Sequence, residues 1–309
     1  MLTYCRYENG KLTYVDSLQA CHVVQAVGPT TVELDALAGS LGVPMDFLTA
    51  ATDRDERPRY EAEDEHKLFV IRVPYHDRRS ETPYVTLAFA IILTPSHIIT
   101  VCAEDSALWG EILSGRGALP PPADRLRFLC MIFLHAARQY LAFLRSIQHE
   151  SDEVERAIHR SMKNETLIRM SNLQKCLVYF TTSLRANESM WDRLRRLAGR
   201  NLTEEEEDLL EDVRVEFGQA RELADIYSNI HTGMMDAFAS IISNNLNTVM
   251  KFLASITIIL MLPTLVASIY GMNIHLPFQD SPHAFWITLA ASVVLSAIGV
   301  VIFLRMKIF

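Results

Sequence analysis

The chain has 309 residues, a formal net charge of −8 and a mean hydropathy of +0.12. The charge is uneven, because residues 251–309 carry a net +2 and residues 1–250 therefore carry −10. An acidic part of this size argues against nucleic acid as a partner and is compatible with divalent cations. These values indicate one water-soluble domain with a small membrane part.

The cysteines are scattered and odd in number, and no two form a C-x-x-C pair. We therefore expect neither a disulfide framework nor a structural zinc site, but ordinary buried thiols in a reducing compartment. The N-terminal sequence has no basic region followed by an apolar core, so no cleaved signal peptide is expected. The five cysteines are Cys5, Cys21, Cys102, Cys130 and Cys176.

Residues 1–118 mix helix and strand signals and are predicted to form an α+β domain. The pattern over 31–42 predicts a short helix that ends at a glycine. The runs 67–73 and 86–103 are rich in β-branched and aromatic residues, which favour strands. A turn sequence interrupts the second run, so that run is predicted to be a hairpin.

Three prolines at 120–122 mark the next boundary. Beyond them, residues 123–200 are predicted to be a helical hairpin, whose two long amphipathic helices lie within 124–198 and are broken near residue 163. The apolar run 128–133 is too short to span a membrane and is interpreted as buried helix.

A third long helix is predicted over residues 203–270. Thr203 precedes Glu206 by three residues, the spacing of a capping box, and acidic residues crowd the first turn, where the helix dipole favours them. No proline interrupts the pattern before Pro263. We expect one helix of roughly 65 residues, about 100 Å long, that needs neighbours for support and continues into a membrane span.

Two apolar stretches near the C-terminus are each predicted to cross a membrane. Residues 252–270 and 284–304 hold 19 and 21 residues without a formal charge, enough to cross a hydrocarbon core of ~30 Å. Lysine and arginine lie before the first span and after the second, but none lies between them. Because basic residues face the cytoplasm, the loop 271–283 is expected outside, and both termini, including the tail 305–309, inside.

One face of the third helix carries polar, small or methionine side chains with a period of about 3.5 residues. Polar groups within a span usually face a bundle interior or a water-filled path. Two interpretations stay open: a seam between closely packed helices, and a pore lining, which would require a ring of subunits. This stripe comprises Asp236, Ser240, Ser243, Asn247, Met250, Ala254, Thr257, Met261, Thr264 and Ser268.

The sequence Tyr270-Gly271-Met272-Asn273, which ends the first of the two spans, resembles the CorA family of divalent-cation (chiefly magnesium) channels. Further similar segments are Glu56-Arg57-Pro58, the 86–103 hairpin, LLEDV (209–213), MMDAF (234–238) and NTVMKFL (247–253). The resemblance implies a homopentamer with a funnel-shaped cytoplasmic domain and a pore lined by the first span. It also implies uptake of Mg²⁺, with Co²⁺ or Ni²⁺ as further ions, across the inner (plasma) membrane.

The resemblance assigns roles to residues of the stripe and of the loop. Gly271, Met272 and Asn273 would form the selectivity filter, with Asn273 as the ring that meets the metal ion. The expected pore positions are polar rings at Thr264 and Asn247, a hydrophobic gate at Met250 and Leu253, a constriction at Met261 and an acidic ring at Asp236. The stripe shows the same face, except that it contains Ala254 where the family would use Leu253.

A physical reason supports the filter. Magnesium sheds its waters reluctantly, so a filter that binds the hydrated ion is favoured. The amide oxygen of Asn273 and backbone carbonyls near Gly271 can accept hydrogen bonds from coordinated water. Glycine and asparagine also tolerate the turn that ends a helix.

The sequence departs from the family at the expected regulatory cation site. Asp212 falls at one of its acidic positions, as a candidate metal ligand. The partner position falls at Thr49 or Ala50, neither of which offers a carboxylate, while Asp53 and Asp55 lie nearby.

The external loop departs too, because the family's acidic Met-Pro-Glu-Leu is replaced by IHLPFQDSP, whose only acid is Asp280. His275 lies within this segment and His283 directly follows it, either as a binding site for entering zinc or cobalt or as exposed loop histidines. The alternatives are a proton-coupled zinc transporter of the same superfamily and a membrane-anchored sensor. No phosphate-binding loop, nucleophile elbow or H-E-x-x-H motif is present, so no enzyme and no organic cofactor are expected.

Overall fold

The computed structural model describes residues 1–114, 119–160, 163–198, 202–272, 274, 276–277 and 281–306. They form two compact units, Met1–Thr232 and Gly233–Phe309. The predicted α+β segment and the predicted helical hairpin both fall within the first unit. Helix α6 (Glu204–Tyr270) runs without interruption from the first unit into the second.

A seven-stranded sheet with the order β2-β1-β3-β7-β6-β5-β4 forms the centre of the first unit. Neighbouring strands are antiparallel except β3 and β7, which run parallel and pair Val23 with Ile98. The predicted strand at 67–73 lies within β5, and the predicted hairpin is β6–β7. The strands are β1 (Leu2–Glu8), β2 (Lys11–Val15), β3 (Val23–Val27), β4 (Arg59–Glu63), β5 (His66–His76), β6 (Tyr84–Leu93) and β7 (Ile98–Cys102).

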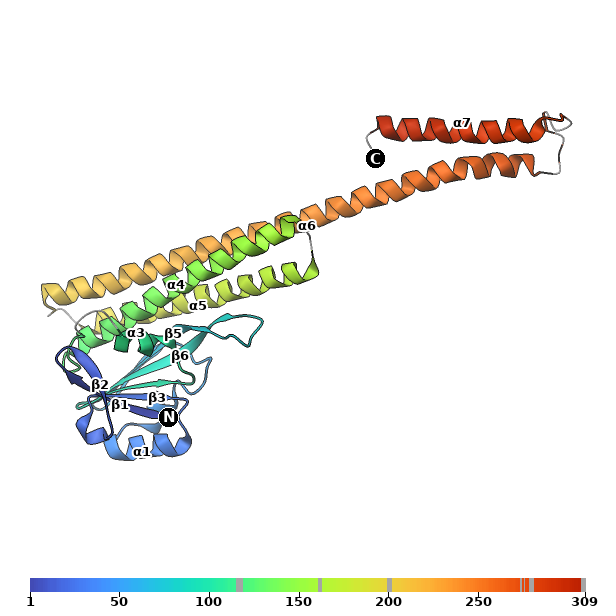
Figure 1. Cartoon of the computed structure of the whole chain (residues 1–309). Coiled ribbons are helices and arrows are strands. Elements are labelled where there is room, and N and C mark those ends of the chain that lie inside the picture. The colour runs from blue at the N-terminus through green and yellow to red at the C-terminus, as the bar shows by residue number, and fades with distance from the viewer. Residues whose placement is uncertain are drawn as a thin grey trace. The chain divides into compact units, whose positions relative to one another are not determined.

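Helices cover both faces of this sheet (Figure 1). Helices α1 (Thr31–Leu41) and α2 (Met45–Thr49) pack on one face through a cluster of buried apolar side chains. Helices α3 (Ala107–Ser114), α4 (Arg125–Arg160) and α5 (Asn164–Ala198) lie on the other. Because both faces are covered, β7 is buried along its whole length, as an apolar run without alternation predicts.

Two helix starts have the predicted capping chemistry. At α1, Thr30 and Glu33 form a capping box, and Gly42 ends the helix in the left-handed region with φ 65°. At α6, the backbone N–H of Thr203 donates to Glu206 at 2.8 Å, and the N–H of Glu206 donates back to the Thr203 hydroxyl at 3.3 Å. Hydrogen bonds from the backbone and hydroxyl of Thr203 lower the pKa of the Glu206 carboxyl. The expected capping box is therefore confirmed.

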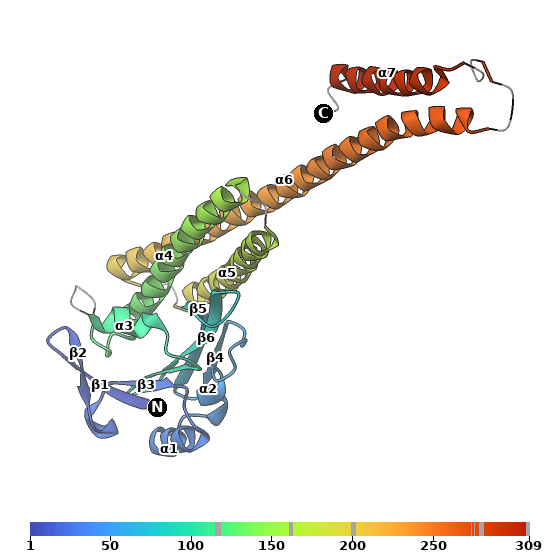
Figure 2. The same cartoon turned by 45° about the vertical axis from the view of Figure 1, so that its right-hand side comes forward.

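The long helices also match their predictions. The break between α4 and α5 lies close to residue 163, and α6 has 67 residues. In the second unit, the C-terminal part of α6 and helix α7 (Ala284–Arg305) lie side by side and run in opposite directions (Figures 1 and 2). Both helices are long and apolar enough to cross a membrane.

Candidate ion-conducting site

The face of α6 that packs on α7 is narrow. Ser255 and Val266 are only 3% and 8% exposed. Between them, Ile259 and Leu262 approach Gly299 of α7 so closely that a Cβ on this glycine would lie 3.2 Å from Leu262 Cδ1. Gly299 therefore permits the close contact of the two helices.

The stripe predicted from the sequence lies on the other side of α6. With about 100° of rotation per residue, the stripe positions between 250 and 268 point roughly 150° away from the face that packs on α7. All ten stripe positions are exposed in this single chain, and so is Leu253. Helix α7 therefore leaves the whole polar face of α6 uncovered.

The hydroxyl groups of this face present oxygen lone pairs outward. Thr257 Oγ1 donates to Leu253 O at 2.8 Å, and Thr264 Oγ1 donates to Leu260 O at 3.2 Å. Because each hydroxyl hydrogen is used within the helix, the oxygen remains available as an acceptor. Water molecules coordinated to a cation donate hydrogen bonds, so this face suits a hydrated cation.

The helix end at the predicted filter differs from the sequence expectation in one respect. Gly271 N–H donates to Ala267 O at 2.9 Å, an ordinary helical bond, and its φ is not positive. The conformational freedom of glycine is thus not used at this helix end. Met272 follows with its side chain half exposed. The key residue Asn273 lies outside the described residues.

Contacts near both of its ends place the described part of the external loop. His275 and Asp280 lie outside the described residues. Tyr270 Oη donates to Pro277 O at 3.4 Å, which brings the loop back toward the end of α6. His283 occupies the N-cap position of α7, and its carbonyl accepts from Ile287 N–H at 3.0 Å.

The acidic residues considered for regulation do not form a metal cluster within the described chain. Asp212 is exposed on α6. Asp53 Oδ1 accepts from the Asp55 N–H at 2.9 Å, which forms a local turn. Thr49 and Ala50 offer no carboxylate. Among the residues that the structure describes, no three His, Cys, Asp or Glu side chains come together to hold a metal ion.

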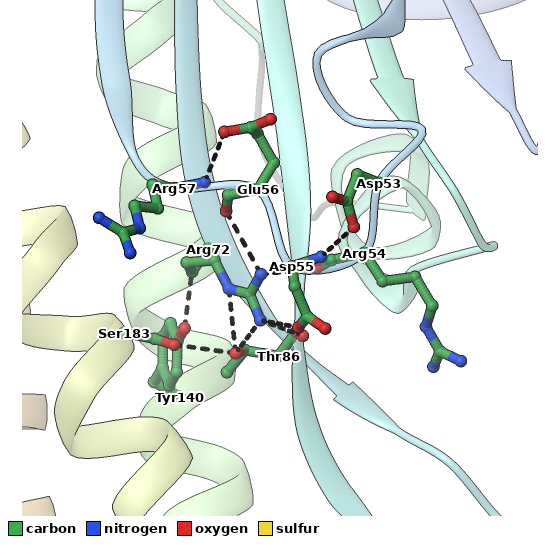
Figure 3. A network of polar contacts seen from close by, with 9 residues as sticks. All are labelled: Asp53, Arg54, Asp55, Glu56, Arg57, Arg72, Thr86, Tyr140 and Ser183. Atoms are coloured by element: carbon green, nitrogen blue, oxygen red, sulfur yellow. Dashed lines mark hydrogen bonds and ion pairs between the residues drawn. The ribbon is translucent and has the colours of Figure 1, made fainter.

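The loop that contains Asp53 and Asp55 is instead fixed by a largely buried arginine, Arg72 (Figure 3). Arg72 of β5 donates through Nη1 to Arg54 O at 2.5 Å and to Glu56 O at 3.3 Å, and through Nη2 to Thr86 O at 2.7 Å. Sequence reasoning missed this network. The available signal was an arginine inside the otherwise apolar run 68–73 of this strand.

Helices α4 and α5 hold the same arginine from the other side. Asn187 Oδ1 accepts from the Arg72 N–H at 2.8 Å, and Asn187 Nδ2 donates to Arg72 O at 2.7 Å. Tyr140 Oη also donates to this carbonyl, at 3.0 Å. Thr86 Oγ1 lies 2.8 Å from Ser183 Oγ. The network therefore joins loop, sheet and helices within the first unit.

Comparison with known proteins identifies the family. A profile of the CorA-like Mg²⁺ transporter protein family matches residues 24–305. The chain belongs to this family. A cobalt/magnesium transport protein, CorA of Methanocaldococcus jannaschii, is 26% identical over 304 residues, which are 97% of this chain and 92% of that protein.

Solved structures share the fold of this CorA-family chain. The complete structure of the CorA magnesium transporter from Methanocaldococcus jannaschii has a TM-score of 0.83 at 24% identity, covering 99% of this chain and 98% of that one. Full-length CmaX follows with a TM-score of 0.71 at 16% identity, covering 99% and 97%. The cytoplasmic domain of ZntB from Vibrio parahaemolyticus has a TM-score of 0.59 at 13% identity, covering 77% and 97%.

The family assignment confirms the resemblance stated from the Gly-Met-Asn motif, and the structural match confirms the predicted fold class. The chain is a CorA-family divalent-cation transporter. The activity of this family is transport. It is neither catalysis nor a purely anchoring role for the two C-terminal helices.

Proposed function

We propose that this transporter conducts divalent cations, with Mg²⁺ as the main ion and Co²⁺ or Ni²⁺ as further ions, along the stripe of α6. One observation carries the proposal: all ten stripe positions are exposed, and those between 250 and 268 lie on the face of α6 opposite α7. A seam between these two helices would have buried the stripe. The relative from Methanocaldococcus jannaschii, named for cobalt and magnesium transport, supports the choice of ions.

The proposed assembly is a homopentamer in the inner (plasma) membrane, with both termini in the cytoplasm and residues 271–283 outside. A single α6 cannot enclose a path, so the stripes of several copies must face one axis. Helix α7 would then lie on the outer side, toward lipid. Its exposed side chains include Val293, Leu295, Ile298 and Val301, which suits that position.

The proposed path orders the residues from outside to inside. Gly271, Met272 and Asn273 form the filter that binds the hydrated ion. Below them come Thr264, Met261 and Thr257, then the apolar constriction at Leu253 and Met250, and finally Asn247 and Asp236. We assign Mg²⁺ as the transported ion only, and give Asp212 no role in this proposal.

The membrane potential is sufficient to drive uptake. A divalent cation gains about 4.6 kcal/mol per 100 mV when it moves to the negative side, which is twice the value for a single charge. A passive path therefore needs no coupled reaction. It needs sites that bind the ion weakly enough to release it, which amide and hydroxyl oxygens provide better than carboxylates.

Magnesium flux into proteoliposomes that hold a magnesium-sensitive dye, at a set membrane potential, tests this proposal. We expect potential-driven flux in wild type and its loss in Asn273→Ala. Gln279→Ala is the matched control, because it also removes an amide from the same loop but outside the filter. It should retain wild-type flux.

The other outcomes are equally informative. Equal loss of flux in both variants would show that the loop needs amides in general. Asn273 would then have no special role as a filter residue. Zinc flux that follows a proton gradient, without Mg²⁺ flux, would establish the zinc-transporter alternative. Absence of flux for either ion would overturn the conduction proposal.

A further inference from the structure

A buried histidine lies on α6 at the end of the first unit. The N-terminal half of α6 presents a buried seam that includes Leu210, Val213, Phe217, Ala220 and Ala224. His231 continues this seam at 0% exposure, and the unit ends at the next residue. An ionisable group thus takes a position that is otherwise apolar, at the end of the first unit.

The hydrogen bonds around His231 determine its tautomer. Ser151 of α4, itself 1% exposed, donates its hydroxyl hydrogen to Ile147 O at 2.7 Å. His231 Nε2 lies 2.6 Å from Ser151 Oγ. With the serine hydrogen on Ile147 O, Nε2 carries a hydrogen and donates it. Nδ1 then holds the lone pair of a neutral imidazole. The other tautomer would place the N–H on Nδ1, which has no hydrogen-bond partner among the described residues.

Nδ1 cannot take up a proton without cost. Among the residues described in this structure, none hydrogen-bonds to this buried atom. A proton there would create a buried charge whose new N–H has no acceptor, which is unfavourable in a low-dielectric environment. Burial accordingly lowers the pKa of His231, while the carboxylate of Asp152 acts in the opposite direction.

The groups around His231 provide little other charge. On α4, Asp152 follows Ser151 and accepts from Gln148 Nε2 at 2.7 Å. On α5, the contact at this level is Gln174 Nε2 to Thr232 Oγ1 at 3.2 Å, and Lys175 is bound to Asn172. Residues 227–235 of α6 contain no Asp, Glu, Lys or Arg. No carboxylate is therefore recorded in contact with Nδ1 within the described chain.

We propose that His231 is a proton-sensitive latch: the neutral imidazole holds α6 against α4 through Ser151, and protonation releases this contact. The released segment is the last turn of α6 within the first unit. Asp236, the first position of the proposed ion path, follows five residues later on the same helix. A link to conduction rests on the proposed function, but the latch itself does not.

The direction of the pH effect follows from the two states. When the contact opens, His231 regains a pKa near the ordinary value of about 6.5, above its value in the closed state. The open state therefore binds more protons, so the contact has its full strength above about pH 6.5 and weakens as the pH falls toward the lowered value. Uptake of one proton limits this change to about tenfold per pH unit.

Hydrogen–deuterium exchange of the full chain in lipid nanodiscs tests the latch. Wild type and His231→Gln are compared at the same pH, from about pH 8 to about pH 5.5, so that intrinsic exchange rates cancel in their ratio. Glutamine can donate to Ser151 Oγ but does not titrate. We expect the ratio over residues 225–240 to stay constant at high pH and to rise by up to about tenfold per unit below about pH 6.5.

The matched control is His149→Gln, which removes an exposed histidine of α4 that lies 3.7 Å from Glu153. It should exchange like wild type at every pH. A wild-type to His231→Gln ratio that does not change with pH would overturn the latch, because a merely structural role produces a constant offset. Exchange of the imidazole C2 hydrogen in wild type needs no variant. It should report a pKa for His231 below the ordinary value of about 6.5, and a value at or above 6.5 would also refute the proposal.

Flux measurements then test the link to conduction separately. Wild-type Mg²⁺ flux should depend on pH at the face that carries the first unit, and His231→Gln should lose that dependence. If the exchange result holds but both proteins show the same pH dependence, the link to conduction is wrong. If neither protein conducts, the proposed function fails, and the exchange result still decides the latch.

Discussion

Arg72 shows how much a single side chain can organise within the first unit. Its side chain is 12% exposed, and it supplies hydrogen bonds to carbonyls from two segments, the loop at 54–56 and strand β6. We expect Arg72→Met to lower the free energy of unfolding by about 2–4 kcal/mol, because methionine fills part of the volume but removes the arginine hydrogen bonds to these carbonyls, although Arg54 O keeps the Ala88 N–H at 3.2 Å. Denaturant titration of the full chain measures this change.

Arg185→Met provides the comparison at an exposed position. Arg185 pairs with Asp225 at 2.9 Å, and its side chain is 63% exposed. An exposed ion pair contributes about 0–1 kcal/mol, so this variant should unfold close to wild type. If both variants lost the same stability, burial of the Arg72 network would have no special energetic role.

Helix α6 has two faces with different roles. One face packs on α7, and the other carries the proposed ion path. Single cysteines at Thr257, Met261 and Thr264 should react with water-soluble thiol reagents, whereas cysteines at Ile259 and Leu262 should not. The native thiols should contribute only a slow background reaction with the reagent. Burial raises the pKa of Cys5, Cys21, Cys102 and Cys176 to about 11 and that of Cys130 to about 12.

Reaction rates plotted along α6 are the measurement. Since the thiolate is the reactive form, a stripe cysteine with an ordinary pKa near 8.5 should react about two orders of magnitude faster than the native thiols. Maxima should recur with a period of about 3.5 residues. Uniform rates around the helix, or maxima on the Ile259 face, would contradict the assignment of the stripe to a water-filled path.

The accuracy of the sequence predictions differs by element for physical reasons. Helices α4 to α7 were predicted closely, because periodicity, prolines and the Thr203–Glu206 cap are local signals. The parallel pairing of β3 with β7 could not be predicted, since it joins Val23 to Ile98 through a non-local contact. The His231–Ser151 contact joins residues 80 positions apart, and no local pattern indicates it.

The candidate site was predicted in the same uneven way. The sequence identified the polar face of α6 by its period. It could not show which face α7 covers, because that depends on how Gly299 packs against Leu262. It also suggested a conformational role for Gly271 that the helical backbone does not require.

At the scale of the whole molecule, the proposed path exists only in an assembly. Every stripe position of one chain is exposed, so several copies must enclose the path. Five copies of a 35.0 kDa chain give about 175 kDa, which native mass spectrometry can measure. A filter built from one Asn273 per copy then makes a quantitative prediction for mixed assemblies.

Co-expression of equal amounts of wild type and Asn273→Ala tests that prediction. If copies mix at random and one altered copy disables the ring, only all-wild-type pentamers conduct, which is about one in thirty-two, or ~3% of the flux. Independent paths in separate chains would leave about half of the flux, and a tetramer about one in sixteen. Mixing with Gln279→Ala should leave the flux unchanged, because that amide lies outside the filter. A residual flux near one half would mean that copies do not share a filter, and the proposed pore on the symmetry axis would be wrong.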